Sequence, residues 1–355
     1  MGQKLRIAVV GAGLIGRQHA QRVRDHPQME LAYVVDPFLQ PADAAFGPGT
    51  IVTADLDKAL GEVDGAIFAT PNALHCEGAL AAVDAGVPAL VEKPIADTLQ
   101  AAERMVAVAE AADVPLLIGH HRRYSPLLDA AAKAVASGAL GNPVAVMGSA
   151  LFHKPDDYFE AAPWRREAGG GPILINLIHD VDDLRALCGE IVRVQATSSN
   201  ATRGFAVEDT AAITLTFANG ALGTFIISDA AASGRSWEQT SRENPSYDTA
   251  PDEDCYHIAG TRGSISVPTM RLRTYEGKAS WWEPFTATVL PIRRQDPLDL
   301  QLDHFAAVVR REAEPKVTAR DGLQSLRVVQ AVIEAARTGQ PVNVPLGLPA
   351  DPAPS

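Results

Sequence analysis

Three glycines near the amino terminus constrain the fold of this chain more than any other feature. Gly11, Gly13 and Gly16 follow an apolar run at residues 7–10 and precede a segment with helical character. Between a strand and a helix, the first glycine permits a tight turn and the second lets the backbone approach a pyrophosphate. The third allows close packing of helix on strand. The spacing predicts a dinucleotide-binding turn, and we group the intervening Leu14 and Ile15 with its cofactor-binding residues.

The pattern around this turn supports that interpretation. Short apolar runs alternate with helix-like segments such as 73–85 and 98–111. Strands that are apolar throughout are typical of parallel sheets buried on both faces. The pattern predicts an α/β fold with a doubly wound parallel sheet, a Rossmann domain over residues 1–121. Its expected strands lie at 7–10, 31–35, 66–69, 89–91 and 116–118.

The rhythm of the chain changes after His120. Asn219-Gly220 separates two strand-like runs and is a strong hairpin signal. Further strands are followed by helices at 298–310 and 321–338, an order typical of an α+β domain. We expect residues 122–345 to form this second domain on a large, mostly antiparallel open sheet, and residues 346–355 to be a flexible tail.

Length and charge limit the classes of function. A chain of 355 residues is long for one core, which favours two domains. The net charge of −12 argues against nucleic-acid binding and against docking on an anionic membrane, and no run approaches the length of a membrane span. The three cysteines include no CxxC pair, which predicts a cytoplasmic protein without a metal site.

The second apolar run ends at Asp36, where a carboxylate accepts hydrogen bonds from ribose hydroxyls and repels a 2′-phosphate. This position predicts NAD rather than NADP. The loops after later strands open on the same edge of the sheet. Lys93 lies in one of these loops, where a solvated lysine is the simpler alternative to a catalytic one. The other candidate residues in these loops are Thr70, Pro71, Asn72, His75 and Glu92.

A helix after residues 169–171 carries a set of polar side chains. Asn176, His179, Asp180 and Asp183 fall at i, i+3, i+4 and i+7 and share one face. The simpler alternative is a polar face turned to water, and we expect the neighbouring Asp182 to be a surface charge. Oxidation of a secondary alcohol sends a hydride to nicotinamide while a base removes the hydroxyl proton.

In that reaction Lys93 stabilises the developing alkoxide and His179 accepts the proton. Asn176, Asp180 and Arg123 are candidates to hold neighbouring hydroxyls of the substrate, and we add Tyr158 to them.

These motifs together resemble the glucose–fructose oxidoreductase/inositol dehydrogenase (Gfo/Idh/MocA) family over nearly the whole chain. The resemblance implies that Lys93 and His179 are the catalytic pair and that Trp164 and Arg165 lie near the cofactor. It also implies a homo-oligomer, a dimer or tetramer formed through the open sheet. Many members have an aspartate one turn before the histidine, where this chain has Ile175. The purpose of His120 and His121 is left open.

The leading hypothesis is an NAD-dependent dehydrogenase acting on CH–OH groups of a sugar, inositol or related cyclic polyol. Two alternatives remain. One is an enzyme that retains NAD and oxidises a sugar transiently, as in an epimerase-like or glycosidase-like reaction. The other is a non-catalytic NAD-binding sensor.

Overall fold

The computed structural model describes residues 3–39 and 46–348, and the chain divides into two compact units. The first unit comprises Met1–His121, Leu298–Leu326 and Gly347–Ser355, and the second comprises Arg122–Pro297 and Arg327–Leu346. The prediction that residues 298–326 belong wholly to the second domain is wrong, since they fold with the first unit. From residue 349 onward, the predicted flexible tail lies outside the described residues.

The first unit contains the predicted doubly wound parallel sheet. Its strand order is β3-β2-β1-β4-β5-β6, and every neighbouring pair is parallel. The short strand β3 carries too little pattern to be recognised in the sequence. The strands are β1 (Leu5–Val10), β2 (Met29–Val35), β3 (Ile51–Thr53), β4 (Gly65–Phe68), β5 (Ala89–Val91) and β6 (Leu116–Ile118).

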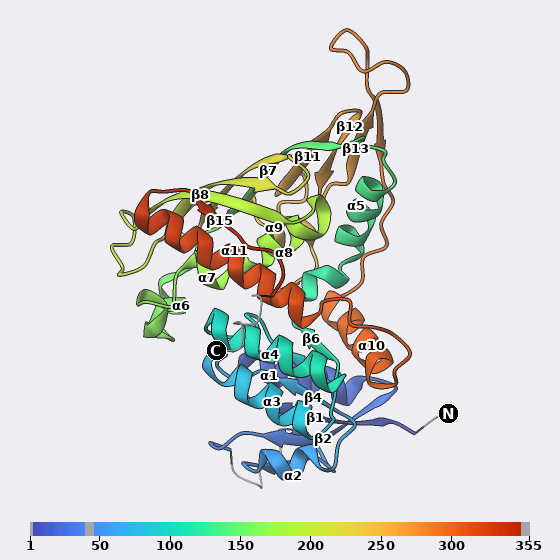
Figure 1. The fold of residues 1–355 in the computed structure, drawn as a ribbon, viewed down its shortest axis with the longest axis vertical. Helices are drawn as coiled ribbons and strands as arrows, with labels where there is room; N and C mark the ends of the chain where they lie inside the picture. The colour runs from blue at the N-terminus through green and yellow to red at the C-terminus, as the bar shows by residue number, and fades with distance from the viewer. Residues whose placement is uncertain (1–2, 40–45, 349–355) are drawn as a thin grey trace, which may run out of the picture. The chain divides into compact units, whose positions relative to one another are not determined.

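Helices cover both faces of this sheet (Figure 1). Ile7 and Ile67 on one face share a core with residues of α1 and with Leu302 and Phe305 of α10. On the other face α3 contacts β4 and β5, and Gly78 of α3 lies against the ring of Phe68. This burial explains why residues 298–326 join the first unit. The helices are α1 (Leu14–Asp25), α2 (Leu56–Leu60), α3 (His75–Asp84), α4 (Leu99–Ala112) and α10 (Pro297–Val309), with a short 3-10 turn at Asn72–Leu74. A second 3-10 turn, His121–Tyr124, begins at the last residue of this segment and continues into the second unit.

The second unit is built on a nine-stranded sheet of order β14-β13-β12-β11-β7-β10-β9-β8-β15. All neighbours are antiparallel except β7 and β10, so the predicted mostly antiparallel sheet is confirmed. The strands are β7 (Pro143–Leu151), β8 (Ile191–Ser199), β9 (Thr210–Phe217), β10 (Leu222–Ser228), β11 (Tyr256–Gly260), β12 (Gly263–Val267), β13 (Arg271–Thr274), β14 (Thr286–Val289) and β15 (Val342–Asn343). The last two were not predicted.

Within residues 3–39 and 46–348, helices cover one face of this sheet and leave the other uncovered. Along β10 buried and exposed residues alternate, with Phe225 and Ile227 inside and Leu222 and Ile226 outside. The buried face packs against α5 (Pro126–Ala136), α8 (Leu177–Cys188) and the carboxyl-terminal part of α11 (Ala319–Thr338), which lie on one side of the sheet in Figure 1.

The predicted helix after residues 169–171 is interrupted. It consists of α7 (Pro172–Ile175) and α8, and Asn176 at the junction has φ −108°. The second unit also contains three short helical segments, which are α6 (Asp156–Glu160), a 3-10 turn at Pro163–Arg166, and α9 (Trp237–Ser241).

Candidate functional site

The glycine turn is shaped so that side chains are excluded at two positions. Gly11 has φ +91°, and a Cβ there would lie 2.7 Å from the carbonyl oxygen of Ala69. A Cβ on Gly16 would lie 1.9 Å from the carbonyl oxygen of Gly11. At Gly13, by contrast, a Cβ would meet nothing within 4 Å. The turn is therefore tight toward the protein and open at Gly13, as a cradle for a pyrophosphate requires.

The amino end of α1 completes this cradle. Gly13 is the N-cap residue of α1, and no side chain caps the helix there. The backbone N–H groups of the first turn therefore have no side-chain acceptor, and the helix dipole favours an anion at this end. Leu14 at the start of the helix is exposed.

Asp36 follows β2 and binds the glycine turn directly. One carboxylate oxygen accepts a hydrogen bond from the N–H of Ala12 at 2.9 Å, and the other accepts one from the N–H of Phe38 at 2.9 Å. The side chain remains partly exposed. These contacts fix the orientation of the carboxylate beside the turn.

His75 connects two loops at the carboxyl edge of the sheet. It is 1% exposed, and its ring nitrogens lie 2.8 Å from the carbonyl oxygen of Pro94 and 2.9 Å from that of Thr70. Burial is the main cause of a lowered pKa of His75. His75 therefore connects the two loops through its ring nitrogens. Pro71 and Asn72, in the first loop, are more accessible, and the buried Thr70 hydroxyl oxygen has no hydrogen-bond partner among the described residues.

Glu92 supports the loop that presents Lys93. Its carboxylate lies 2.8 Å from Nε2 of His19 on α1 and accepts a hydrogen bond from the N–H of Lys93 at 3.2 Å. Burial alone would raise the pKa of Glu92, but the hydrogen bond and charge of His19, with the charges of Lys93 and His121, lower it overall. Lys93 is partly exposed, and His120 is buried.

Helix α8 is buried along almost all of its length. His179, Asp180 and Asp183 are at most 8% exposed, so the alternative of a polar face turned to water is wrong. The expectation that Asp182 is a surface charge is also wrong. Asp182 is 1% exposed and lies 3.4 Å from Arg123 and 3.6 Å from Arg185, which compensate its burial.

A buried ionic cluster holds this helix. The Arg122 guanidinium lies 3.1 Å from Asp180, 3.3 Å from Asp183 and 2.5 Å from Glu238. The Tyr256 hydroxyl lies 2.5 Å from the same oxygen of Asp180 and 3.0 Å from Asp183. One cation thus faces three carboxyl groups, and not all of them can be ionised together without a large cost.

The protonation of the cluster follows from this imbalance. Burial, with the nearby charges of Asp180 and Asp182, raises the pKa of Asp183 to about 8. Burial raises the pKa of Asp180 to about 6, and Arg122 and Tyr256 oppose that rise. A phenol donates only one hydrogen bond, so the proton between Tyr256 and Asp183 comes from the carboxyl group when Tyr256 donates to Asp180.

Another group of charges surrounds Asn176 at the start of α8. The Lys154 ammonium donates a hydrogen bond to the Asn176 amide oxygen at 2.8 Å and lies 3.5 Å from Asp229. Arg203 lies closer to Asp229, with its Nε at 2.9 Å. The carbonyl oxygen of Asn176 accepts the N–H of His179 at 3.1 Å, so this group abuts the turn that presents the histidine.

The remaining predicted residues of the second unit lie on α6 and the turn after it. The Arg165 guanidinium stacks 3.7 Å from the centre of the Tyr158 ring and donates a hydrogen bond to the carbonyl oxygen of Tyr158 at 2.6 Å. Trp164 is 56% exposed, whereas tryptophan side chains are on average largely buried. The stacking and the hydrogen bond hold Arg165 and Tyr158 together.

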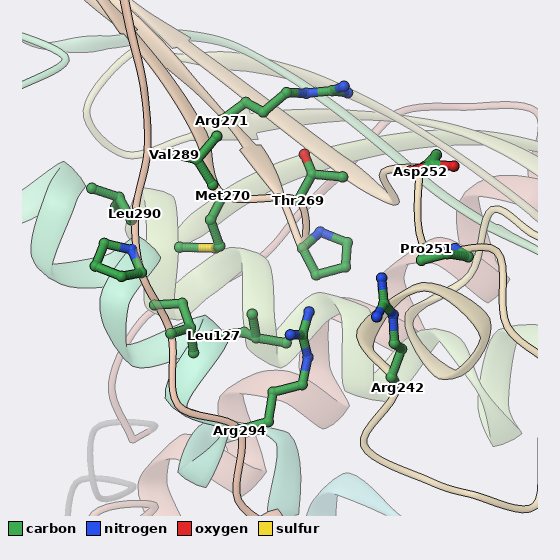
Figure 2. Close-up of a pocket in the computed structure, with 13 residues that line it drawn as sticks. Leu127, Arg242, Pro251, Asp252, Thr269, Met270, Arg271, Val289, Leu290 and Arg294 are labelled. Carbon is green, nitrogen blue, oxygen red and sulfur yellow. The ribbon is translucent and has the colours of Figure 1, made fainter.

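A separate hollow of about 460 Å³ in the second unit includes no predicted site residue. Figure 2 shows its lining, in which apolar side chains such as Met270 and Leu290 lie opposite Arg242 and Arg294. Within residues 3–39 and 46–348, no cluster of His, Cys, Asp or Glu has an arrangement suited to a metal ion. No helix in the same part of the chain is both long and apolar enough to cross a membrane.

Sequence reasoning missed the residues that support the site. The partners of Asp180 are Arg122 and Tyr256, which are 58 and 76 residues away in sequence. The Arg122-Arg123 pair was visible in the sequence, but its first member gave no local sign of burial. His19 and Lys154 had no distinguishing pattern either.

Comparison with known proteins agrees with this geometry. Residues 5–120 match the model of the Gfo/Idh/MocA oxidoreductase family, NAD-binding Rossmann fold, and residues 132–344 match its C-terminal alpha/beta domain. The chain is 31% identical over 317 residues to 1,5-anhydro-D-fructose reductase of Ensifer adhaerens, covering 85% of this chain and 86% of that protein. It is 28% identical to D-apiose dehydrogenase of Paraburkholderia graminis, covering 95% and 89%.

A solved structure resembles both units. The WlbA dehydrogenase of Bordetella pertussis, determined with NADH and UDP-GlcNAcA, superposes with a TM-score of 0.76 at 26% identity, covering 97% of this chain and 100% of that one. The glycine cradle, the two-unit fold and these matches agree, and the chain belongs to the Gfo/Idh/MocA family of NAD-binding oxidoreductases.

Proposed function

We propose that this oxidoreductase transfers a hydride between NAD and a secondary alcohol or ketone of a sugar, inositol or related cyclic polyol. The observation that carries the proposal is the glycine cradle of the first unit together with the buried histidine on α8 of the second. The relatives named as a reductase of anhydrofructose and a dehydrogenase of apiose support the substrate class.

NAD is held by groups of the first unit in this proposal. The open position of Gly13 and the amino end of α1 would hold the pyrophosphate, with backbone N–H groups of Leu14 and Ile15 as donors. The Asp36 carboxylate accepts the ribose hydroxyls. The loops that His75 and Glu92 support contribute Thr70, Pro71 and Asn72. From the second unit, Trp164 and Arg165 contact the cofactor. NAD supplies the hydride chemistry when it is bound.

Lys93 and His179 carry the acid–base chemistry. The Lys93 ammonium donates a hydrogen bond to the reacting oxygen and stabilises its developing negative charge. His179 removes the hydroxyl proton in oxidation and returns it in reduction, because an imidazole exchanges protons near neutral pH. Arg123, Asn176 and Tyr158 bind the other polar groups of the substrate.

Asp180 has a different role from the direct substrate contact first expected of it. Its Oδ1 accepts hydrogen bonds from both Arg122 and Tyr256, and the residue is 1% exposed. We assign it to holding the first turn of α8, and thereby the position of His179.

We also propose that the protein is a homo-oligomer assembled through the uncovered face of the second sheet. Met147, Leu222 and Ile226 are exposed together on β7 and β10, whose neighbouring registers place them on one face. An apolar patch of this kind favours burial against a second copy. Sedimentation velocity measures the assembly directly. The three buried free cysteines support a reducing, cytoplasmic location.

The decisive experiment measures NADH formation by the full chain with NAD⁺ and a panel of inositols, aldoses and cyclic diols. Lys93→Met is expected to lower kcat at least about 100-fold, because a positioned proton donor or acceptor contributes that much. Binding of NADH, followed by its fluorescence, is expected to persist. Lys58→Met, an exposed lysine of the same unit, is the matched control.

Unchanged turnover in Lys93→Met contradicts the catalytic assignment. NAD that stays bound through purification, without net NADH, indicates transient oxidation instead. NAD binding without turnover of any substrate indicates a sensor.

A further inference from the structure

Two adjacent tryptophans at the tip of one hairpin are almost fully exposed. The hairpin is formed by β13 and β14, and residues 275–285 connect the two strands. Trp281 is 86% exposed and Trp282 is 82% exposed, which leaves two of the largest apolar side chains in water. In Figure 1 this connection projects away from the sheet. An exposed apolar surface of this kind marks a site of contact with another molecule.

Local contacts give the tip a definite shape. The rings of Tyr275 and Phe285 stack with their centres 4.3 Å apart, and the N–H of Glu283 donates to the carbonyl oxygen of Ser280 at 3.1 Å. The two indoles meet edge to face, with centres 5.4 Å apart and planes at 74°. Two rings at this angle do not form one flat platform on which a sugar could stack. They form a projecting knob, which suits insertion into a hollow.

The charge of the tip limits the kind of partner. Glu276 and Glu283 outnumber Lys278 within residues 275–285. An anionic membrane attracts basic segments, so the acidic tip does not suit such a surface. Tryptophan and arginine are the side chains most enriched at the centres of protein interfaces, where they often face each other. The tip therefore fits a protein surface that is apolar and positively charged.

The hollow of about 460 Å³ in the second unit has these two properties. Its apolar lining includes Met270 and Leu290, and Figure 2 shows Arg242 and Arg294 facing them. The Nε of Arg294 donates a hydrogen bond to the carbonyl oxygen of Ser241 at 3.0 Å, which holds that guanidinium in place. An arginine beside an apolar wall can bind the face of an indole ring through a cation–π contact.

Nearby carboxylates do not neutralise both arginines. Arg271 also lines the hollow, but it pairs with Asp254 at 2.6 Å. Asp252 is exposed at the rim. Burial raises the pKa of Glu243, which faces Arg294, to about 7, so this carboxyl group is only partly charged near neutral pH. In the part of the chain that the structure describes, neither of the two arginines that face the apolar lining forms an ion pair.

The tip and the hollow lie at opposite ends of the same hairpin. The N–H of Leu290 donates to the carbonyl oxygen of Met270 at the base, and four residue pairs of β13 and β14 separate this base from the tip. We propose that the tryptophan pair of one copy inserts into the hollow of a second copy, and that the two copies exchange this contact reciprocally. The contact goes beyond the proposed hydride transfer and is separate from an interface through the uncovered sheet face.

Strand β14 provides the geometry for such an exchange. It is an edge strand, and all of residues 286–289 are exposed. Two hairpins that lie side by side in opposite directions across a two-fold axis bring each tip to the base of the other. A tryptophan buries about 150–250 Å², so four of them bury roughly 600–1,000 Å² before the surface of the two hollows is added. A stable interface needs about 1,200 Å² or more, which this exchange can reach.

The test is a disulfide cross-link between two full-length chains, one of which carries a mass tag. The tagged chain has Ala279→Cys at the tip, and the untagged chain has Asp252→Cys at the rim of the hollow, while the three native cysteines are buried. After co-expression and mild oxidation, we expect a linked pair of one tagged and one untagged chain on a non-reducing gel. Lys133→Cys, exposed but outside the hollow, replaces Asp252→Cys as the matched control, with about 10-fold less cross-link expected.

Sedimentation velocity gives the energetic test. The double variant Trp281→Ala/Trp282→Ala is expected to weaken self-association about 30-fold or more, because buried tryptophans contribute strongly to interfaces. Arg242→Ala should weaken it in the same direction. Lys278→Ala removes an exposed lysine of the same tip and is the matched control, with self-association expected to be unchanged.

Absence of the tagged–untagged cross-link overturns the inference, and so does unchanged self-association of the double tryptophan variant. Cosedimentation of the wild-type chain, but not of that variant, with phosphatidylcholine vesicles or with insoluble glucan also overturns it, because the tip then has another occupant.

The two interfaces and the proposed function can be separated. Leu222→Asp, on the uncovered sheet face, is expected to keep the cross-link, and its loss would contradict a separate contact. No residue of the tip or the hollow belongs to the proposed catalytic site. A failed cross-link in an active protein therefore contradicts this inference alone, and a cross-linked protein without turnover contradicts only the proposed function.

Discussion

The glycine turn of the first unit and helix α8 of the second both carry predicted site residues, but they are built differently. The turn uses backbone: Gly11 and Gly16 exclude side chains, and backbone N–H groups face the open position at Gly13. Helix α8 uses buried charge, with Arg122 compensating several carboxyl groups. A site built from backbone requires that certain positions carry no side chain. A buried ionic site requires that each of its charged side chains has its partners.

The sharpest test of this comparison is Gly16→Ala against Gly13→Ala. The Gly16 methyl would lie 1.9 Å from a backbone oxygen that cannot move without opening the turn. We expect Gly16→Ala to lower the free energy of unfolding by more than about 3 kcal/mol and to abolish NAD binding. Chemical denaturation and NADH fluorescence measure the two effects.

Gly13→Ala is the matched control, because its methyl meets nothing within 4 Å. It is expected to leave stability unchanged and to weaken NAD binding about 10-fold or more, since the methyl occupies the space of the pyrophosphate. Equal loss of stability in both variants would contradict the steric account of the turn.

Arg122→Met probes the second region. Removal of the one guanidinium leaves buried carboxyl groups uncompensated, and we expect a loss of about 3–5 kcal/mol in the free energy of unfolding. Arg123→Met, which removes a partly exposed neighbour with one contact at 3.4 Å to Asp182, should cost less. A cost for Arg122→Met no larger than that for Arg123→Met would show that the cluster is not the main support of α8.

The pH dependence of stability gives a smaller effect. The pKa of Asp183 is raised to about 8 from an ordinary value of 3.8, so between these pH values the native state holds a proton that the unfolded chain has lost. Stability from this group is therefore present at low pH and declines as pH rises toward 8. The raised pKa values of Asp180, about 6, and Glu243, about 7, act in the same direction.

Asp183→Asn cannot titrate and should make the decline shallower by at most about 1.4 kcal/mol per pH unit between pH 5 and 8. Denaturant titrations at several pH values measure this slope. Asp129→Asn, at an exposed pair with Lys133, is the control and should leave the slope unchanged. A steeper slope in Asp183→Asn would reverse the protonation assigned to the cluster.

The same contrast explains how far the sequence could predict the molecule. The glycine turn, most strands of the first unit and the position of Asp36 follow from local patterns, because they depend on neighbours in the chain. The contacts of Asp180 depend on Arg122 and Tyr256, and one partner of the buried Asp182 is Arg123, all of which come from distant segments. Periodicity places a residue on a helix face, but it does not reveal which distant element covers that face.

The break between α7 and α8 shows a second limit. Residues 172–188 have a continuous helical pattern, and no proline or glycine lies next to Asn176 to predict a break there. Its departure from helical geometry accompanies a side-chain contact to Lys154, 22 residues earlier in the chain. A local pattern cannot report a contact of this kind.

The return of residues 298–326 to the first unit has a consequence for how this protein is made. The core around Ile7 and Ile67 includes Leu302 and Phe305, which leave the ribosome roughly 300 residues later. Part of one face of the amino-terminal sheet therefore stays uncovered while residues 122–297 of the second unit are synthesised. A fragment ending at residue 121 would keep that exposed face permanently and is expected to aggregate. Expression of the nucleotide-binding unit alone would need residues 298–326 joined to it through a short linker.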